Sequence, residues 1–479
     1  MRLSEYYSLE REQGSLEFVD VDTVNDVPLF VDPGAIRYLT TTLARGCTSL
    51  VQSFFQCVIQ CIKDGRDGQA QALLASLGEP NETRLGLSSG RARGRGMADG
   101  LAWGMWSALS RSKAVETGIL DDLEETALFV EGIDRDIISD VVTNIIRAPL
   151  IGFTATMAVK YDIEVYPGFA LSVWDRQSRS WVQTQCALPY AGDLPVLLVP
   201  RMFVRRGRGV YSADRYYRHF VIPALQQEHF SASSELVRWL VNGTPRPPHK
   251  KTLMELHPHV KETNTEVTED HPDLLEDYRK DARRGFRIVT QEELAKGIGT
   301  SPPDFDQLLA EVLSVVPGKK EATVYHLAVE KLLTAIFFPA LDMPVVEKKI
   351  HEGRKRIDID YTNIATKGFF YWLHAVHGVS CSFVPVECKN YSQDIGNPEY
   401  DQLTSRFSIQ TGSVGMLCYR KISNKSDVIA HCRDSARDGR GYIIALDDMD
   451  LTKMVNERKS VDGGDEFRYL FERFRDIVQ

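Results

Sequence analysis

The segment between residues 353 and 389 constrains the fold and chemistry of this chain more than any other stretch. It contains GRKRIDIDYTNIA and, after a short amphipathic piece, FVPVECKNY. Side chains alternate between the two faces of a strand, so Asp358 and Asp360 share one face, and Glu387 and Lys389 share a face of the second strand. Glutamate and lysine are poor strand formers. Their position in a strand therefore indicates a chemical role.

The residue types in these two strands are those of phosphodiester hydrolysis. Mg²⁺ prefers oxygen ligands and is usually held by one or two carboxylates, with water and substrate phosphate completing its shell. Asp358 and Glu387 supply carboxylates, and the backbone carbonyl of Cys388 supplies a further oxygen. Lys389 is expected beside the attacking water, where it orients or deprotonates the water and offsets charge on the phosphorane. We therefore expect a site for Mg²⁺ or Mn²⁺.

A glutamate in the preceding segment, VYHLAVEKLLTAIF, is a further candidate. The segment has helical periodicity, which places Leu327, Glu330 and Thr334 on one stripe. Glu330 is therefore expected to point from a helix toward the metal. The alternative for all these charges is structural: an ion-pair ladder on an edge strand with a solvated face beside it.

The order of a helical glutamate, a strand aspartate and a Glu-x-Lys strand resembles the PD-(D/E)XK nuclease superfamily, which has the restriction-endonuclease-like fold. The resemblance covers roughly residues 317–450. Asp358 matches the metal aspartate of that family, the segment from Glu387 to Lys389 matches its E-x-K, and Glu330 matches its helical glutamate. The resemblance implies Mg²⁺ or Mn²⁺, in-line attack by water, and products with 5′-phosphate and 3′-hydroxyl ends.

The match departs from the family pattern at one place, because no proline precedes Asp358. Asp358 and Asp360 therefore both remain candidates for the principal ligand. The segment NPEYDQLTSRF resembles the helix that follows the motif in this superfamily. Gln402 and Arg406 lie four residues apart on it and so share a helical face. The resemblance places polar side chains there near the site or the DNA backbone.

The later sequence completes the expected fold. GSVGMLCYR and GYIIALDD read as a third and a fourth strand, with a helix over about 425–437 between them. We expect an α/β protein in which a restriction-endonuclease-like mixed sheet, flanked by helices, forms a nuclease domain over 304–479. A larger α/β (α+β) regulatory or recognition domain is expected over 1–243, and a linker with connecting helices over 244–303.

Charge limits how the chain meets nucleic acid. The chain of 479 residues has a formal net charge of −9, which argues against indiscriminate coating of nucleic acid, because phosphate affinity depends on Lys and Arg. A nuclease is not excluded, since metal neutralises an acidic site. Two short segments rich in arginine are candidate nucleic-acid contacts, with a solvated loop as the alternative in each case. Their residues are Arg91, Arg93, Arg95, Arg205, Arg206 and Arg208.

These observations together predict a metal-dependent DNA endonuclease gated by its N-terminal domain. The layout resembles bacterial restriction and anti-phage defence effectors, an argument by analogy. The alternatives are a catalytically silent nucleic-acid-binding effector and a sensor or scaffold subunit of a larger complex. Expected partners are DNA, a second copy of the chain, and an ATPase or helicase subunit. The start lacks an apolar leader and no run is long enough to cross a bilayer, so a cytoplasmic protein with no membrane partner is expected.

Overall fold

The chain forms two compact units in the computed structural model. The described residues are 1–86, 96–120, 122–133, 135–192, 194–207, 211–240, 242–350, 355–420, 424–460 and 466–479. The first unit comprises Met1–Tyr7 and Val21–Arg287, and the second comprises Ser8–Asp20 and Ile288–Gln479. The predicted boundaries at 243/244 and 303/304 differ from this division. Most of the expected linker is helical and belongs to the first unit.

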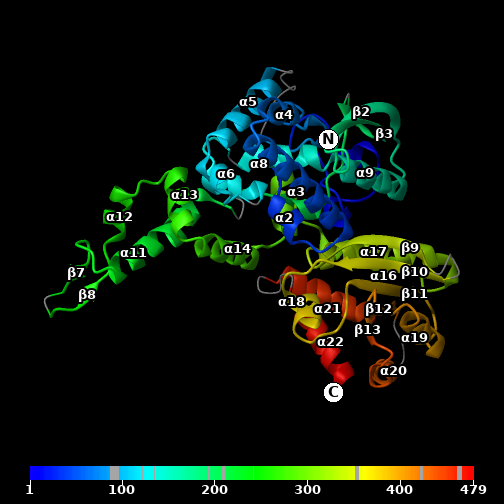
Figure 1. Ribbon diagram of the computed structural model, residues 1–479. Coiled ribbons are helices and arrows are strands. Elements are labelled where there is room, and N and C mark those ends of the chain that lie inside the picture. The colour runs from blue at the N-terminus through cyan, green and yellow to red at the C-terminus, as the bar shows by residue number, and fades with distance from the viewer. Residues whose placement is uncertain are drawn as a thin grey trace. The chain divides into compact units, whose positions relative to one another are not determined.

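The first unit is mainly helical (Figure 1). Its longest helix begins after Thr41, whose side chain accepts a hydrogen bond from the Ala44 N–H and so caps the first turn. Residues 35–63 have a continuous helical pattern in the sequence, but this cap divides them between two helices. The helices are α1 (Leu3–Tyr6), α2 (Pro33–Tyr38), α3 (Thr42–Lys63), α4 (Asp67–Leu74), α5 (Gly96–Ser110), α6 (Lys113–Thr117), α7 (Thr126–Phe129), α8 (Arg135–Ile145), α9 (Arg147–Tyr161), α10 (Ala213–Tyr216), α11 (Ile222–Ser231), α12 (Lys250–Leu256), α13 (Lys261–Asp270) and α14 (Asp273–Gly285).

The strands of the first unit pair only in twos. The antiparallel pairs are β1 (Phe30–Val31) with β6 (Val204–Arg205), β2 (Tyr166–Asp175) with β3 (Ser180–Leu188), β4 (Tyr190–Ala191) with β5 (Leu194–Pro195), and β7 (Arg238–Trp239) with β8 (Pro245–Arg246). The sequences FALSVWD and SWVQTQCAL, joined by RQSR, predict a hairpin, and β2 and β3 form it with the turn between Asp175 and Ser180.

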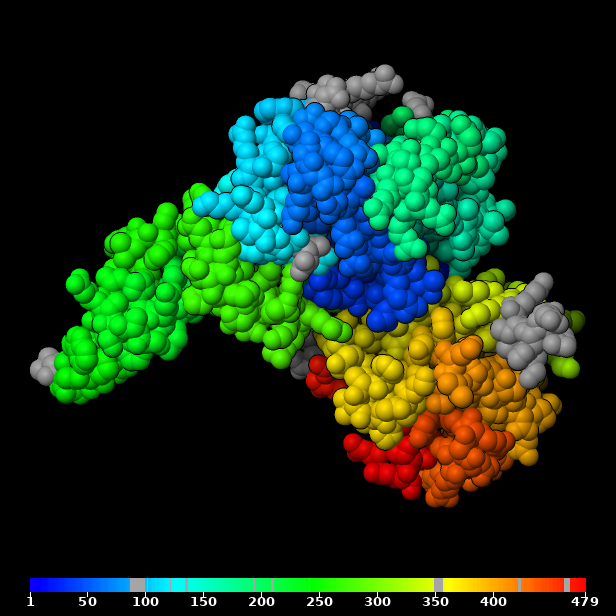
Figure 2. Space-filling model, viewed as in Figure 1, coloured from blue at the N-terminus to red at the C-terminus, as the bar shows by residue number. Residues whose placement is uncertain are grey.

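The end of the expected N-terminal domain and the start of the expected linker together form a defined substructure. Helices α11 and α12 pack together and carry the β7–β8 hairpin at their far end (Figures 1 and 2). Two hydrogen bonds hold α11 and α12 together. The Gln226 side chain donates to the Pro248 carbonyl at 2.7 Å, and the Tyr217 hydroxyl donates to the His257 carbonyl at 2.5 Å. We call residues 222–256 the hairpin arm. The prolines in NGTPRPPHKK predicted a linker. Prolines also occur at the ends of short edge strands, and here they lie in and after β8.

No single helix in the described parts of the chain is long and apolar enough to cross a membrane. One bent pair, Ile137–Ile145 with Arg147–Tyr161, passes that test by length and composition when both are taken together, and its two helices meet at 69°.

The second unit is organised around a five-stranded mixed sheet. Its strands are β9 (Leu341–Ile350), β10 (Lys355–Asn363), β11 (Phe383–Lys389), β12 (Val414–Tyr419) and β13 (Tyr442–Leu446), in the spatial order β13-β12-β11-β10-β9. The β9–β10 and β10–β11 pairs are antiparallel, and the β11–β12 and β12–β13 pairs are parallel. A mixed sheet was predicted, but the edge strand β9 was missed.

Helices cover both faces of this sheet. Tyr361 of β10 bonds to Thr334 of α17 at 2.8 Å, whereas Lys389 of β11 bonds to Gln402 of α19 at 3.0 Å. Tyr361 lies opposite Val384, and Lys389 has the other parity on β11, so α17 and α19 lie on opposite faces. The helices are α15 (Gln291–Ile298), α16 (Phe305–Ser314), α17 (Ala322–Phe337), α18 (Gly368–Ala375), α19 (Asn397–Thr404), α20 (Lys425–Arg437), α21 (Asp448–Lys459) and α22 (Arg468–Val478), with a 3₁₀ turn η6 (Lys319–Glu321) before α17.

An N-terminal segment belongs to the second unit although it is remote in sequence. Residues Ser8–Asp20, which we call the N-terminal strap, bury Leu16 and Phe18 completely. Gln291 donates from its side-chain amide to the carbonyls of Gly14 and Ala335, both at 3.1 Å, which ties the strap to α17. The sequence patterns gave no indication of this arrangement.

Candidate active site

A polar cavity of about 450 Å³ opens in the second unit beside β10 and β11. It contains six of the residues singled out from the sequence: Asp358, Glu387, Cys388, Lys389, Gln402 and Arg406. The other lining residues are Lys319, Ala322, His326, Arg356, Asn390 and Tyr391. The two strands and the segment that includes α19 therefore bring the predicted carboxylates, lysine and flanking polar residues to one place.

Asp358 lies just beyond the point where the regular pairing of β10 with β11 ends. The regular β10–β11 register runs as far as Ile359 opposite Val386. Beyond that pair, the Cys388 N–H donates to the Asp358 carboxylate at 2.9 Å. The side chain of Asp358 is 17% exposed. A backbone donor thus fixes this carboxylate at the wall of the cavity while leaving it accessible.

Glu387 is fully buried, and its two oxygens have different surroundings. Oε1 accepts a hydrogen bond from Lys389 Nζ at 3.1 Å and another from the Gln402 side-chain amide. Oε2 is buried and has no hydrogen-bond partner within the described residues. Burial and the nearby charge of Asp358 raise the pKa of Glu387 to about 7. A further positive charge nearby would therefore stabilise the ionised form of Glu387.

Lys389 completes a tight group with Glu387 and Gln402. Its ammonium donates to Glu387 and, at 3.0 Å, to the side-chain oxygen of Gln402. Burial alone would lower the pKa of Lys389, but the carboxylates of Glu387 and Asp358 outweigh burial and raise it. Lys389 is therefore a protonated donor in this state. Of its two predicted roles, orientation and charge compensation fit this state, and proton abstraction does not.

Asp358 and Asp360 were both candidates, and the structure places them differently. Asp360 is 3% exposed and forms an ion pair with Lys348, away from the residues that line the cavity. It lies further along β10, opposite Pro385 of β11. Sharing a face of the strand was therefore not sufficient for sharing a site. Asp358 is the carboxylate that faces Glu387.

Glu330 does not lie where the sequence placed it. It is fully buried on α17 and pairs with Arg11 of the N-terminal strap at 2.5 Å, and the cavity is lined without it. Thr334, on the same stripe, contacts the buried Tyr361. This stripe of α17 therefore faces the interior of the unit. Only the first turns of the helix reach the cavity, which is why the expected contact is absent.

His326 is the residue of α17 that reaches the site, one turn before Glu330. Its Nε2 lies 3.0 Å from the Cys388 carbonyl oxygen and 3.8 Å from the Asp358 carboxylate. The sequence contains a weak indication of this residue: His326 precedes Glu330 by four residues and therefore lies on the same helical stripe. At this position His326 holds the carbonyl group of Cys388, the residue between Glu387 and Lys389.

Asn390 was also missed, although it directly follows the Glu-Cys-Lys motif. Its side-chain amide donates to the carbonyls of Val316 and Gly318, each at 3.0 Å, and the Gly318 N–H donates back to the Asn390 carbonyl at 2.7 Å. These bonds fix the loop that leads into η6 and so place Lys319 at the cavity wall.

The cavity is positively charged around its two carboxylates. Arg406 is 8% exposed, and its Nε is a buried donor that finds no acceptor in the described parts of the chain. It follows the end of α19, while Gln402 lies on the helix itself. The other basic side chains of the lining are Lys319, His326, Arg356 and Lys389. An anionic ligand such as a phosphate suits this lining.

Of the arginines predicted as nucleic-acid contacts, Arg205 and Arg206 are described by the structure and belong to the first unit. Arg205 pairs with Asp32 at 2.8 Å, within the first unit, and its side chain is 17% exposed. Arg206 is exposed in the bend after β6. Arg91, Arg93, Arg95 and Arg208 lie outside the described residues.

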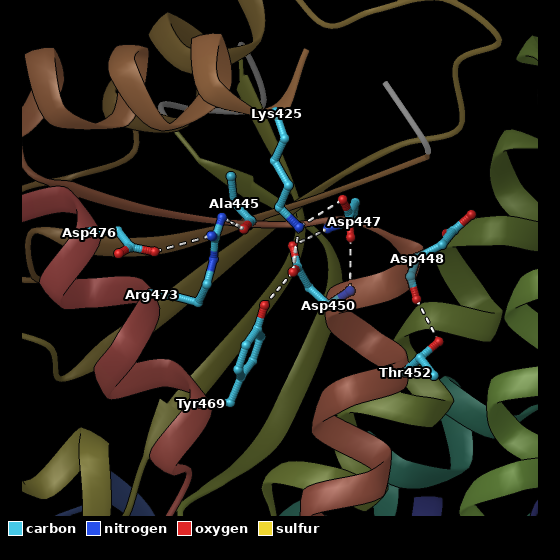
Figure 3. A network of polar contacts seen from close by, with 9 residues as sticks. All are labelled: Lys425, Ala445, Asp447, Asp448, Asp450, Thr452, Tyr469, Arg473 and Asp476. Carbon is cyan, nitrogen blue, oxygen red and sulfur yellow. Dashed lines mark hydrogen bonds and ion pairs between the residues drawn. The ribbon is translucent and has the colours of Figure 1, made fainter. Parts of the chain in front are cut away.

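A second polar cluster in the same unit resembles the site in composition. Asp447 and Asp450 cap α21, and Lys425 donates to both, at 2.9 Å and 2.6 Å (Figure 3). The Tyr469 hydroxyl donates to Asp450 at 2.5 Å. Backbone N–H groups satisfy the remaining carboxylate oxygens of this pair. Every one of these four oxygens has a donor, so this cluster is a structural cap.

The cavity residues fit a hard divalent cation. The described residues contain no group of three or more His, Cys, Asp or Glu side chains arranged to hold a metal. Mg²⁺ does not require such a cage, because one or two carboxylates with water are its usual ligands. Asp358, Glu387 and the Cys388 carbonyl offer such a set. The buried Glu387 Oε2, which lacks a donor, is the observation that favours a cation.

Comparison with known proteins gives one match. The family described as "Domain of unknown function (DUF8370)" matches residues 8–212. This span covers the strap and much of the first unit, and it includes neither the cavity residues nor the hairpin arm. No curated protein and no solved structure matches the chain.

Proposed function

We propose that the second unit is a metal-dependent nuclease of the restriction-endonuclease-like class that hydrolyses phosphodiester bonds of DNA. The observation that carries the proposal is the buried Glu387 Oε2, which has no donor and lies beside Asp358 and Lys389 in a cavity rimmed by basic side chains. The mixed sheet, with its strand-aspartate next to its Glu-x-Lys strand, supports the same class.

The polar residues around Glu387 have distinct tasks in this proposal. Asp358, Glu387 and the Cys388 carbonyl hold Mg²⁺ or Mn²⁺, and a bound ion supplies Lewis acidity toward the phosphate and lowers the pKa of its water. Gln402 orients Glu387 and Lys389 together, since it donates to one and accepts from the other. His326 steadies the peptide carbonyl of Cys388.

The basic residues act on the substrate. The Lys389 ammonium donates to the phosphate and offsets the negative charge that grows as water attacks in line. Arg406 has a buried N–H available for a phosphate oxygen. Lys319 and Arg356 line the same cavity and bind neighbouring phosphates of the strand. The products carry 5′-phosphate and 3′-hydroxyl ends.

The biological setting proposed for this activity is restriction or anti-phage defence, with the first unit as its gate. This part rests on the resemblance of the layout alone. A silent nucleic-acid-binding effector and a sensor or scaffold subunit are the alternatives: an activity assay separates the nuclease from both, and DNA binding separates the effector from the scaffold.

The test compares two aspartates of one strand. Purified protein is incubated with supercoiled plasmid in Mg²⁺, in Mn²⁺ and in EDTA, beside the variants Asp358→Asn and Asp360→Asn. We expect metal-dependent nicking that Asp358→Asn loses and Asp360→Asn retains. If Asp360→Asn alone loses activity, the site is misassigned. If a correctly folded wild type cleaves neither plasmid nor single-stranded DNA with any metal, the nuclease proposal is wrong; binding of DNA without cleavage then selects the silent effector, and no binding selects the sensor or scaffold.

A further inference from the structure

The hairpin arm of the first unit carries an unusual arrangement of charge. Arg238 and Arg246 are directly opposite each other in the β7–β8 ladder, so both side chains lie on one face of the ribbon. Like charges at directly opposite positions destabilise a strand pair. Both residues are exposed. An anionic partner that binds both guanidinium groups removes this repulsion.

The surrounding sequence reinforces this positive charge. Residues 236–254 contain four Lys or Arg and no Asp or Glu, in a chain whose net charge is −9. Lys250 and Lys251 follow β8 at the start of α12 and are exposed. The hairpin and the start of α12 are therefore a local basic segment, flanked by Glu235 and Glu255, on an acidic protein, which favours a polyanion over a neutral partner.

The side chain of Arg238 is held in place. Its Nε donates to the Pro247 carbonyl at 2.9 Å, and its Nη1 lies 2.8 Å from His249 Nε2. The hairpin itself is fixed by a turn in which the Leu240 N–H donates to the Thr244 carbonyl at 3.0 Å. A preorganised guanidinium loses less entropy on binding than a free one.

The other face of the ribbon presents an aromatic ring. Trp239 is paired with Pro245 in the ladder and is 66% exposed, and the adjacent Leu240 is 43% exposed. A two-stranded ribbon without a covering layer buries neither of its faces. The indole and the two guanidinium groups therefore lie on opposite faces, and a strand that passes around the edge of the ribbon stacks a base on Trp239 while the cations hold its phosphates.

We infer that the hairpin arm is a nucleic-acid-binding surface for DNA with an accessible base, such as a single strand. Arg238, Arg246 and the two lysines of α12 contact the phosphates, and Trp239 stacks on an unpaired base. The choice of DNA over an anionic membrane or an acidic protein rests on the proposed function of the second unit, which acts on phosphodiesters. The surface itself is distinct from the cavity.

The test measures binding in EDTA, so that cleavage does not interfere. Full-length protein with Asp358→Asn is titrated into fluorescein-labelled single-stranded and duplex 30-mers, and anisotropy is followed at several salt concentrations. We expect Arg246→Glu to weaken binding about tenfold and to reduce the salt slope by about one or more. We expect Trp239→Ala to weaken single-strand binding about tenfold and to affect the duplex less.

Matched variants separate this surface from a general loss of charge or of an aromatic ring. Trp103 on α5 is 58% exposed, and Lys280 on α14 is 63% exposed, and both belong to the first unit. Trp103→Ala and Lys280→Glu should leave both affinities unchanged. Arg246→Glu should also raise thermal stability slightly, because it replaces an Arg–Arg pair with an ion pair. A merely structural role for Arg246 predicts lower stability instead.

Three outcomes overturn the inference: unchanged binding in both Arg246→Glu and Trp239→Ala, equal losses in the matched variants, or binding to phosphatidylserine vesicles that exceeds binding to DNA. The plasmid assay is independent of this one. Hairpin-dependent binding without cleavage by the wild type supports this inference and removes the nuclease proposal. Cleavage without hairpin dependence does the reverse.

Discussion

Two clusters in the second unit contain the same kinds of residue and serve different purposes. The cavity holds Asp358, Glu387 and Lys389, and the cap of α21 holds an Asp pair with Lys425. The β11, β12 and β13 strands are parallel, so both clusters lie at the carboxyl edge of the sheet. Each combines two carboxylates with one lysine. Composition therefore does not distinguish them.

Hydrogen-bond satisfaction does distinguish them. All four carboxylate oxygens of Asp447 and Asp450 accept from Lys425, Tyr469 or backbone N–H groups. In the cavity, Glu387 Oε2 has no donor among the described residues, and the buried Arg406 Nε has no acceptor among them. A buried polar atom left without a partner costs free energy, and a bound ligand recovers that cost. Of the two clusters, the cavity is therefore the one that a ligand would stabilise.

The largest effect should come from exchanging one carboxylate in each cluster. We expect Glu387→Gln to reduce plasmid cleavage about 10⁴-fold, or about 5 kcal/mol of transition-state stabilisation, because it removes a metal ligand. Asp447→Asn keeps a side chain that caps a helix equally well. Its cleavage rate per folded molecule should stay within about twofold of wild type. Equal losses in the two variants would mean that the clusters do not differ in role.

The next effect concerns the buried pair between Arg11 and Glu330, whose side chains are 8% and 0% exposed. Arg11→Ala should destabilise the second unit by about 3–5 kcal/mol, because it leaves a buried charge without its partner. The double variant Arg11→Met with Glu330→Gln should recover most of that loss. Urea unfolding monitored by far-UV circular dichroism measures both. A loss below about 1 kcal/mol in Arg11→Ala would contradict the pairing.

A third prediction extends the comparison to a buried glutamate of the first unit. Burial raises the pKa of Glu124 to about 8, although Arg37 opposes the shift. The folded state therefore holds this proton more tightly than the unfolded state. Its contribution to stability is complete below pH 4.5, falls by about 1.4 kcal/mol per pH unit as the pH rises, and is lost once the pH passes about 8.

Glu124→Gln should remove this part of the pH dependence. We expect the variant to gain stability over the wild type between pH 6 and pH 9, measured as the difference in thermal midpoint at each pH. Glu276→Gln, at an exposed position on α14, provides the control. If the difference between wild type and Glu124→Gln does not change with pH, the carboxyl group is ionised throughout.

The smallest effect should come from the α21 cap itself. Asp447→Ala removes the acceptor for the Asp450 N–H and one acceptor for Lys425. We expect a cost of about 1–2 kcal/mol, typical of a helix N-cap, with no change in metal dependence of cleavage. Chemical denaturation and the plasmid assay together check this. A change in the metal requirement would connect the cap to the site.

The sequence determined those features that depend on neighbouring residues. Alternation along β10 and β11 placed Asp358 on the face that meets Glu387 and Lys389, because period two is a property of any strand. The mixed sheet followed from the order of strands and helices. Spacing also related Gln402 to Arg406, and both line the cavity. The β2–β3 hairpin was read from its pattern in the same way.

Only the tertiary structure decided which partner each side chain meets. Glu330 is paired with Arg11, which is 319 residues distant in sequence, and no local pattern reports such a contact. Asp360 meets Lys348 of β9, a strand that was not predicted. Residues 244–256 of the hairpin arm were predicted as linker from their proline-rich composition, and the pairing of β8 with β7 was not visible in that composition. Periodicity fixes the face a residue occupies, whereas long-range packing fixes whether that face meets a core, an ion pair or an open cavity.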